Sequence, residues 1–295
     1  MRTKSPPASR ALRVIGILRS CFREKFGTPR QSHLAPAATA ALKVSAEHIP
    51  AQSLAGLERF SHVWLVSYFH LNTNKRFLPK VHPPRLKGRA VGLFASRSPH
   101  RPNPMGLSLA RLVRVEGDTL HLSGIDLVDG TPILDVKPYI PESDSVPDAS
   151  SGWTEDAPFT TLGVAFTARA LSDIAAAQRR LKAGGLKRLL TQILSQDIRN
   201  PRDRSQSEEG RDLGFFLHDF EARFSVRNGT ATVLRLETGT KMHKKERRTP
   251  PKTFARQDLR PGTPQQRLHA DRAHRSREHV HGVVGAQDQH RGHLE

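Results

Sequence analysis

The sequence predicts a mainly β protein with a small β-barrel domain, a small α+β domain and a disordered basic tail. Short segments with alternating polarity recur in the first half, helical spacing appears only after about residue 158, and apolar residues become scarce after residue 240. We therefore expect domains at 1–158 and 159–240, followed by a tail at 241–295. The short, closely spaced strands of the first domain fit a barrel or a sandwich.

Strands of the first domain are predicted where β-branched and aromatic residues gather between turn formers. Alternation on both sides of Glu116-Gly117-Asp118 predicts a hairpin. The segment 96–104 contains three prolines and can form neither a helix nor a central strand. The expected strands are 14–19, 57–69, 90–95, 107–115, 119–125 and 131–138, and the expected loops are 22–36 and 72–89.

The second domain combines strand and helix signals. A strand is expected at 161–167, and helical spacing runs over 172–196, with a start at Ser172-Asp173 and a break at Gly184-Gly185. Asn228-Gly229 predicts a hairpin within 219–236.

The last 55 residues have 13 Lys or Arg, 6 acidic residues and 7 His, with few apolar positions. This composition is typical of disorder. An RNA-binding tail and a non-native segment are the alternative interpretations.

The charge is strongly basic and unevenly distributed. Lys and Arg number 47 against 28 Asp and Glu, a net charge of +19, which favours a polyanionic partner such as nucleic acid. Residues 59–115 contain eleven Lys or Arg and no acid, whereas 116–156 contain ten acids and one Lys. The basic block forms a continuous positive field if it stays together, and loses it if strand pairing mixes the two blocks.

Several classes of function are excluded by missing residues. The single cysteine, Cys21, rules out a disulfide within the chain and a cysteine-based zinc site, which fits a reducing compartment. The sequence has no G-x-G-x-x-G after a strand, no P-loop and no zinc-deaminase signature. No apolar stretch has membrane or signal-peptide length, so we expect a cytoplasmic protein.

The first candidate site motif is the proline-rich stretch GLFASRSPHRPNPMGLSL. Its rigid loop carries Arg97, His100, Arg101 and Asn103. Such a loop presents donors at a low entropy cost, and arginine binds carboxylate or phosphate through two hydrogen bonds. A structural turn with solvated arginines is the alternative.

A second candidate motif, IDLVDGTPILDVKPYIP, contains three aspartates. Asp126 and Asp129 fit ordinary turn positions, whereas Asp135 lies between apolar neighbours on an expected strand. In the stretch GLERFSHVWLVSYFH, His62 and His70 lie near the ends of an apolar strand, where a histidine is more often structural than catalytic.

Five blocks resemble the TrmO (TsaA-like) family in that family's order: IGILRSCFREKFGTPRQ, AGLERFSHVWLVSYFHLN, VHPPRLKG, GLFASRSPHRPNPMGLSL and SGIDLVDGTPILDVKPYIPESDSVPDASSGW. Together they cover most of residues 13–153. ILSQDIRNPR and FFLHDFEARFSV also resemble the family's smaller C-terminal domain. Many members have a Pro-Arg-Pro-Ala-Tyr run where this chain has residues 198–202, which puts any tRNA contact of that run in doubt.

The resemblance implies a tRNA methyltransferase that uses S-adenosylmethionine (SAM) on a small β-barrel and needs no metal. Members methylate the exocyclic amine of threonylcarbamoyl-adenosine next to the anticodon, and are usually homodimers with SAM near the subunit interface. The residues carried over as SAM contacts are Arg30, Gln31, His70, Leu71, Arg97, Leu107, Ser123, Gly124, Ile125 and Asp126.

The substrate also carries a carboxylate on its threonine arm, for which the basic block is the expected receptor. The substrate-binding candidates are Arg85, His100, Arg101 and Asn103. Asp126, Asp135 and His70 are unranked candidates for a base that removes the amine proton. A barrel enzyme with a small-molecule acceptor and a noncatalytic RNA-binding protein are the competing hypotheses.

Overall fold

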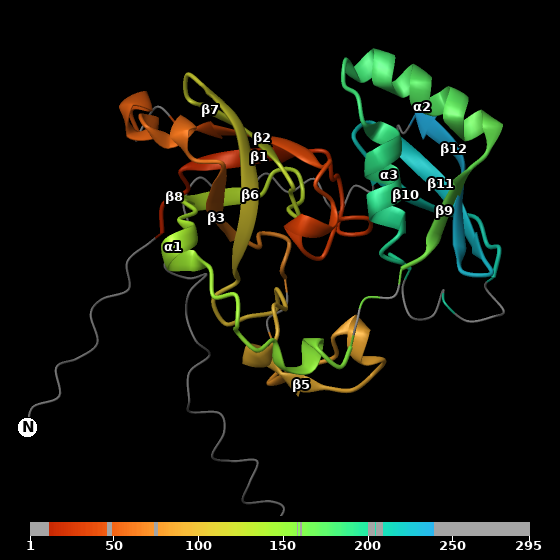
Figure 1. Cartoon of the computed structure of the whole chain (residues 1–295), viewed down its shortest axis with the longest axis horizontal. Coiled ribbons are helices and arrows are strands. Elements are labelled where there is room, and N and C mark those ends of the chain that lie inside the picture. Colours follow the sequence, from red (N-terminus) through yellow and green to blue (C-terminus); the bar gives the residue numbers. More distant parts are fainter. Residues whose placement is uncertain are drawn as a thin grey trace, which may run out of the picture. The chain divides into compact units, whose positions relative to one another are not determined.

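The structure, a computed structural model, describes residues 12–45, 49–73, 76–157, 159, 161–199, 204 and 209–238. These residues form a closed β-barrel followed by a four-stranded sheet with two helices (Figure 1). The predicted tail at 241–295 lies outside the described residues.

The barrel is closed by six antiparallel strands in the order β1-β2-β7-β6-β3-β8, so the mainly β prediction is confirmed and the barrel, not the sandwich, is the architecture. Closure leaves no open sheet edge. Its strands are β1 (Gly16–Ser20), β2 (Thr39–Val44), β3 (His62–Tyr68), β6 (Met105–Glu116), β7 (Thr119–Ser123) and β8 (Pro132–Pro138).

Alternation along these strands sends one set of side chains into the barrel core. β3 follows this pattern in all seven residues, with Val63, Leu65 and Ser67 buried and their neighbours partly exposed. Bulges interrupt the ladders between β3 and β8 and between β6 and β7, and bulges of this kind bend strands at barrel corners. The other fully buried barrel side chains include Leu18, Leu42, Leu120, Leu122 and Ile133.

The long connection between β3 and β6 has more structure than its composition predicts. It contains the two-stranded ladder of β4 (Lys80–Val81) and β5 (Val91–Gly92), so the expected strand at 90–95 is only partly correct. Short 3-10 helices occupy the barrel loops: η1 (Ser32–Leu34), η2 (Ala51–Leu54), η3 (Leu57–Arg59), η4 (Pro84–Leu86), η5 (Leu93–Ala95) and η6 (Gly152–Thr154). A one-turn helix, α1 (Pro141–Asp144), follows β8.

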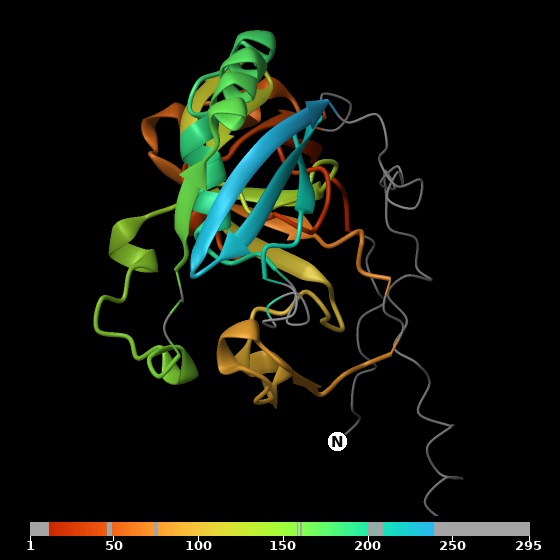
Figure 2. The same ribbon diagram turned by 90° about the vertical axis from the view of Figure 1, so that its right-hand side faces the viewer.

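The C-terminal part is a twisted sheet in the order β10-β11-β12-β9, in which β9 runs parallel to β12 (Figure 2). Its strands are β9 (Gly163–Phe166), β10 (Leu213–Leu217), β11 (Phe220–Arg227) and β12 (Thr230–Thr238). The helices are α2 (Ala168–Leu181) and α3 (Leu186–Leu194), and α2 packs against β12.

Most of the turn and helix-boundary predictions for the C-terminal part are confirmed. The Asn228-Gly229 hairpin has positive φ at both residues, as a type I′ turn requires, and the helical segment breaks at Gly185 with φ 80°. The predicted helix start at Ser172 is wrong, because Thr167 caps α2 by accepting a hydrogen bond from the backbone N–H of Ala170 at 3.0 Å. The domain boundary at residue 158 remains a prediction.

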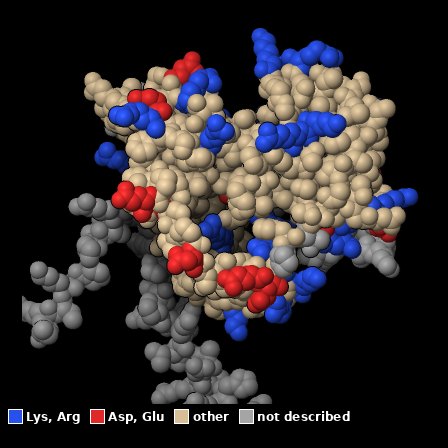
Figure 3. All heavy atoms as spheres, viewed as in Figure 1, with Lys and Arg blue, Asp and Glu red and all other residues tan. Residues whose placement is uncertain are grey.

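Folding mixes the acidic and basic blocks. β3, from the acid-free block, pairs with β8, from the acidic block, and Arg114 of β6 lies 3.0 Å from Glu116 at the end of the same strand. Acidic side chains interrupt the basic ones over the barrel on the face shown in Figure 3. The continuous positive field expected of residues 59–115 therefore does not form on this face.

The barrel and the C-terminal sheet are joined along residues 21–24. Phe22 forms an isolated bridge with Leu217, and the backbone N–H of His218 donates to the carbonyl of Cys21 at 2.7 Å. Burial raises the pKa of Cys21 to about 12, so its thiol is protonated and unreactive at neutral pH.

Gly27→Ala should destabilise the protein by more than Gly56→Ala does. Both glycines have φ near +85°, so each substitution strains the backbone, but only at Gly27 would the new Cβ lie 2.5 Å from Cδ2 of Phe215. We expect Gly27→Ala to cost roughly 1–3 kcal/mol more than Gly56→Ala in the free energy of unfolding, because overpacking adds to the shared backbone strain. Urea denaturation of both variants measures this difference, and equal losses would show that Phe215 does not restrict the loop.

Candidate functional site

The loop at residues 22–37, between β1 and β2, is held from the C-terminal part. Glu24 Oε1 accepts the backbone N–H of Phe216 at 3.1 Å, and Gln192 Oε1 of α3 accepts the backbone N–H of Ala37 at 2.9 Å. These contacts lie at the two ends of the loop. They hold the segment that carries Arg30 and Gln31 from both sides.

Three loops meet beside this segment. Arg97, in the proline-rich loop, donates from Nη1 to Oε1 of Gln31 at 2.6 Å. Asp126, in the loop after β7, accepts hydrogen bonds from the hydroxyl of Ser108 at 2.6 Å and from the backbone N–H of Ser32. The structure thus brings together three residues that the sequence predicts as cofactor contacts: Gln31, Arg97 and Asp126.

Asp126 provides the carboxyl of this cluster, and its surroundings shift its pKa. Burial raises its pKa, and the hydrogen bond from Ser108, backbone N–H groups and the charge of Arg97 oppose that rise. A carboxylate that is buried, hydrogen-bonded and faced by an arginine is a strong candidate for a functional group.

The stretch 123–126 approaches the 22–37 loop through its backbone. Gly124 has φ +68°, and its N–H donates to the carbonyl of Ala38 at 2.8 Å. The side chain of Ile125 is fully buried in the core, so this residue can meet a ligand only through its main chain.

His70 and Leu71, which follow β3, lie beside the start of the 22–37 loop. Lys25 Nζ donates to the carbonyl of Leu71 at 2.8 Å. Burial, and secondly the charge of Lys25, lower the pKa of His70, which Asp129 opposes only in part. The His70 ring is therefore neutral at neutral pH.

Leu107 is not part of this cluster within one chain. It neighbours Ser108 on β6, and because successive strand residues face opposite sides, its side chain lies on the outside of the barrel with 58% exposed. Asp135 also faces outward, half-exposed and 3.0 Å from Lys137. Neither side chain contacts the Asp126 network.

The four residues predicted to bind the substrate do not form one binding site. Arg85 donates to the carbonyl of Thr154 at 2.7 Å and to that of Ala157, and its guanidinium stacks on Phe159 at 4.1 Å. Its donors are directed at the backbone of this chain.

The others belong to the proline-rich loop. Arg101 donates to the carbonyl of Ser96 at 2.9 Å, and His100 Nδ1 lies 3.1 Å from Asn72 Oδ1. Asn103 is exposed, and its carbonyl accepts the N–H of Met105. These contacts shape the loop that presents Arg97.

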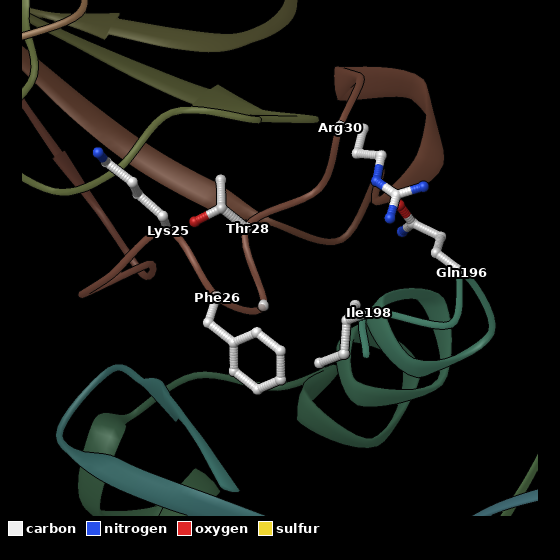
Figure 4. A pocket seen from close by; sticks show the side chains of 7 residues that line it. Lys25, Phe26, Thr28, Arg30, Gln196 and Ile198 are labelled. Atoms are coloured by element: carbon white, nitrogen blue, oxygen red, sulfur yellow. The ribbon is translucent and has the colours of Figure 1, made fainter. Parts of the chain in front are cut away.

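Two residues near the site, Ser108 and Lys25, were not predicted from the sequence. Ser108, within GLSLA, is a polar residue at an inward strand position, a signal that alternation could have supplied. Lys25 lies in the charged loop EKFGTPRQ, whose composition does not distinguish it from the other charged residues there. Lys25 and Arg30 line a cavity of about 400 Å³ together with Phe26, Gly27, Thr28, Gln196 and Ile198 (Figure 4).

Within the described residues, no three His, Cys, Asp or Glu side chains gather closely enough to hold a metal ion. No helix in this part of the chain has the length and apolar character needed to span a bilayer.

The fold and the site define a small β-barrel ligand-binding protein with an appended α+β domain, in which an Arg–Gln pair and a buried carboxylate meet between loops. The chain belongs to the TrmO family of tRNA methyltransferases. Residues 17–145 match the model of the tRNA-methyltransferase O N-terminal domain, and residues 160–239 match that of the TrmO C-terminal domain.

Individual relatives agree with this assignment. The tRNA (adenine(37)-N6)-methyltransferase of Escherichia coli K12 is 40% identical over 228 residues, which are 76% of this chain and 96% of that protein. A putative S-adenosylmethionine-dependent methyltransferase, RcsF, of Pseudomonas aeruginosa is 44% identical over 71% of this chain and 90% of its own length. The crystal structure of TrmO from Pseudomonas aeruginosa, at 38% identity, superposes with a TM-score of 0.65 and covers 78% of this chain and 98% of that one.

Ser108→Ala should destabilise the protein in a pH-dependent way. Because the folded-state pKa of Asp126 is raised, ionisation of this carboxyl lowers stability as the pH rises through that pKa, and the Ser108 hydroxyl limits the loss. We expect a cost of about 1–3 kcal/mol near pH 8 that shrinks as the pH falls toward 3.8, the ordinary aspartate value.

The matched control is Ser67→Ala. Ser67 is also buried, on the neighbouring strand, but its hydroxyl has no hydrogen-bond partner among the described residues. Urea denaturation at several pH values compares the two. A cost for Ser108→Ala that is the same at every pH would contradict the assigned role of the Asp126 charge.

Proposed function

We propose that this chain methylates the N6 amine of adenosine 37 in tRNA with SAM as methyl donor, and that its acceptor is the threonylcarbamoyl form of that base. The observation that carries the proposal is the Gln31–Arg97–Asp126 cluster, in a chain that belongs to this family and aligns with 96% of its E. coli relative. Family membership favours an enzyme over a noncatalytic RNA-binding protein.

The residues of the cluster fit the chemical groups of SAM. Arg97 uses Nη1 on Gln31, and the fork of a guanidinium suits the carboxylate of the cofactor. The main chain of residues 123–126 offers groups for an adenine edge, since the Ile125 side chain is buried. When bound, SAM supplies an electrophilic methyl group on its sulfonium.

Of the three candidate bases, we favour Asp126. Its raised pKa makes it a better proton acceptor than an ordinary aspartate, and the Ser108 hydroxyl and Arg97 hold and face its carboxylate. Asp135 is half-exposed beside Lys137, and burial together with the charge of Lys25 disfavours the protonated form that His70 would have to reach as a base. In the reaction, Asp126 would take the N6 proton as the amine gains the methyl group.

Positioning supplies much of the rate of such a displacement, because the amine and the methyl group must be aligned. The 22–37 loop serves this role, since the C-terminal part holds both of its ends. The acceptor base lies in a single-stranded tRNA loop, which lowers the cost of presenting it. We place this activity in the cytoplasm.

The first experiment measures transfer of labelled methyl from SAM to tRNA with and without the threonylcarbamoyl mark. We expect label on the marked tRNA only. Arg97→Met should weaken SAM binding at least about tenfold through loss of one charged contact, whereas Lys187→Met, in α3, should not. Label on unmarked tRNA would contradict the acceptor, and SAM binding without transfer to any tRNA would point to a small-molecule acceptor.

We also propose that the chain acts as a homodimer whose interface includes the outer face of β3 and β6. Leu107 pairs with Val66, and Leu109 with Trp64, so these strands place apolar side chains side by side on the outside of the barrel. Because Leu107 neighbours Ser108, a partner covering this face would lie close to the cofactor site.

Leu107→Glu should convert the dimer to a monomer and reduce methyl transfer. The control is Val113→Glu on the same strand, since Val113 is 55% exposed against 58% for Leu107 but lies six residues farther along. A charge buried without a partner opposes association by several kcal/mol, about a hundredfold or more in the dissociation constant. Light scattering reads the mass of each variant, and a dimeric Leu107→Glu protein would exclude this face.

A further inference from the structure

The connection between β3 and β6 forms a basic arm at residues 76–101. Seven Lys or Arg and no acidic residue occur in this segment. β4 pairs with β5, and both strands come from the acid-free block, so strand pairing does not mix this part of the block with acidic strands. Lys and Arg side chains project from the lower edge of the molecule in Figure 3, in the region where Figure 1 labels β5.

Several cations of the arm are not used by the protein itself. The side chains of Lys80, Lys87 and Arg89 are exposed and form no hydrogen bond or ion pair within the described residues. Residues 155–156, both acidic, lie between the two carbonyls that Arg85 binds, and neither forms an ion pair with the arm. A group of cations without acidic partners favours a polyanion as the ligand.

The arm also carries an exposed aromatic ring, Phe94, three residues before Arg97. Phe94 is 74% exposed, against 50% for Phe77. The guanidinium of Arg101 lies over the Phe94 ring, 5.3 Å from its centroid. Because the arginine covers one face of the ring, the other face is open to a ligand. An aromatic ring in this setting suits stacking on a nucleobase.

Hydrogen bonds keep Phe94 close to the cofactor cluster. The hydroxyl of Ser96 donates to the carbonyl of Leu93 at 2.8 Å, and Arg101 donates to the carbonyl of Ser96 at 2.9 Å. Three residues span at most about 11 Å, so the Phe94 ring lies near any acceptor that reacts beside Arg97. A nucleotide next to that acceptor can therefore reach the ring.

The segment after β8 holds the arm from the other side. Trp153 Nε1 donates to the carbonyl of Ala95 at 2.8 Å. Arg85 lies over the Trp153 ring at 5.7 Å and donates to the carbonyl of Thr154. A surface that is ordered before binding loses little conformational entropy when a ligand binds.

We propose that Phe94, supported by Arg101, stacks on a nucleobase next to the methyl acceptor in a single-stranded RNA loop, and that Lys80, Lys87 and Arg89 contact phosphates of the same strand. This inference rests on the proposed function, which supplies a tRNA loop as the substrate. A single exposed apolar side chain needs no ligand to explain it. The combination of an exposed ring with free cations is the one that proteins use to bind single-stranded RNA.

The test measures equilibrium binding of marked tRNAs in which the base on one or the other side of the acceptor is replaced by an abasic site. The wild type should lose affinity about fivefold or more at one of the two positions, as expected for the loss of one stacked base. Phe94→Ala should bind the intact tRNA about as weakly and should not respond to that abasic site. Phe94→Tyr, which keeps the ring, should behave like the wild type.

The matched control is Phe60→Ala. Phe60 is 37% exposed and follows η3, in the connection between β2 and β3, outside the arm. This variant should bind each tRNA as the wild type does. The SAM affinity of Phe94→Ala should stay unchanged, and because the side chain is mostly exposed, the substitution should leave the fold intact.

Salt dependence separates stacking from phosphate contacts. Phe94→Ala should keep the wild-type slope of log affinity against log salt concentration, because stacking releases no counterion. Lys87→Met should lower the slope by about 0.7, the value for one phosphate contact with a single strand. An unchanged slope for Lys87→Met would exclude the phosphate contact.

Four results would overturn the stacking role of Phe94. Two are a wild type that ignores both abasic sites and a Phe94→Ala protein that binds intact tRNA as tightly as the wild type. The third is a parallel fall in SAM affinity, which would assign the ring to the cofactor site. The fourth is a change of oligomeric mass in light scattering, which would assign it to a subunit contact. All four leave the proposed function in place, since its own test is methyl transfer by the wild type.

Discussion

The docking of the 22–37 loop onto the C-terminal part is the constraint on which the site depends. The loop has little regular structure of its own beyond the single turn of η1, so outside contacts add to its few internal hydrogen bonds in setting its shape. Backbone pairing of Phe22 with Leu217 anchors its start, and the side-chain amides of Gln192 in α3 and of Gln196 after it hold its end. The barrel supplies the other side of the site through Arg97 and Asp126, and the C-terminal part holds both ends of the loop that carries Arg30 and Gln31.

The late segments that form α3 and β10 therefore matter for the site on the barrel, because they hold the 22–37 loop. Gly27 illustrates the coupling. Its positive φ lets the loop turn, and the absence of a Cβ lets the loop rest on the Phe215 ring of β10. A residue that reads as an ordinary turn glycine in the sequence is therefore also a contact between the two parts.

Sequence patterns predicted the elements that depend on local chemistry. The hairpins at Gly117 and Gly229 and the break at Gly185 follow from backbone preferences that no tertiary contact overrides. β2 and β10 escaped prediction. β2 is formed by TAALKV, which lacks a strong β-branched pattern and becomes a strand because it pairs on both sides with β1 and β7.

The same division holds for the site. Resemblance supplied Gln31, Arg97 and Asp126, and the structure brings them together. Resemblance could not indicate that Arg85 donates to backbone carbonyls, because those acceptors lie 69 and 72 residues away in sequence. Nor could charge counting reveal that strand pairing mixes the basic and acidic blocks. Such effects depend on which distant segments come into contact, and these contacts are set by the whole fold.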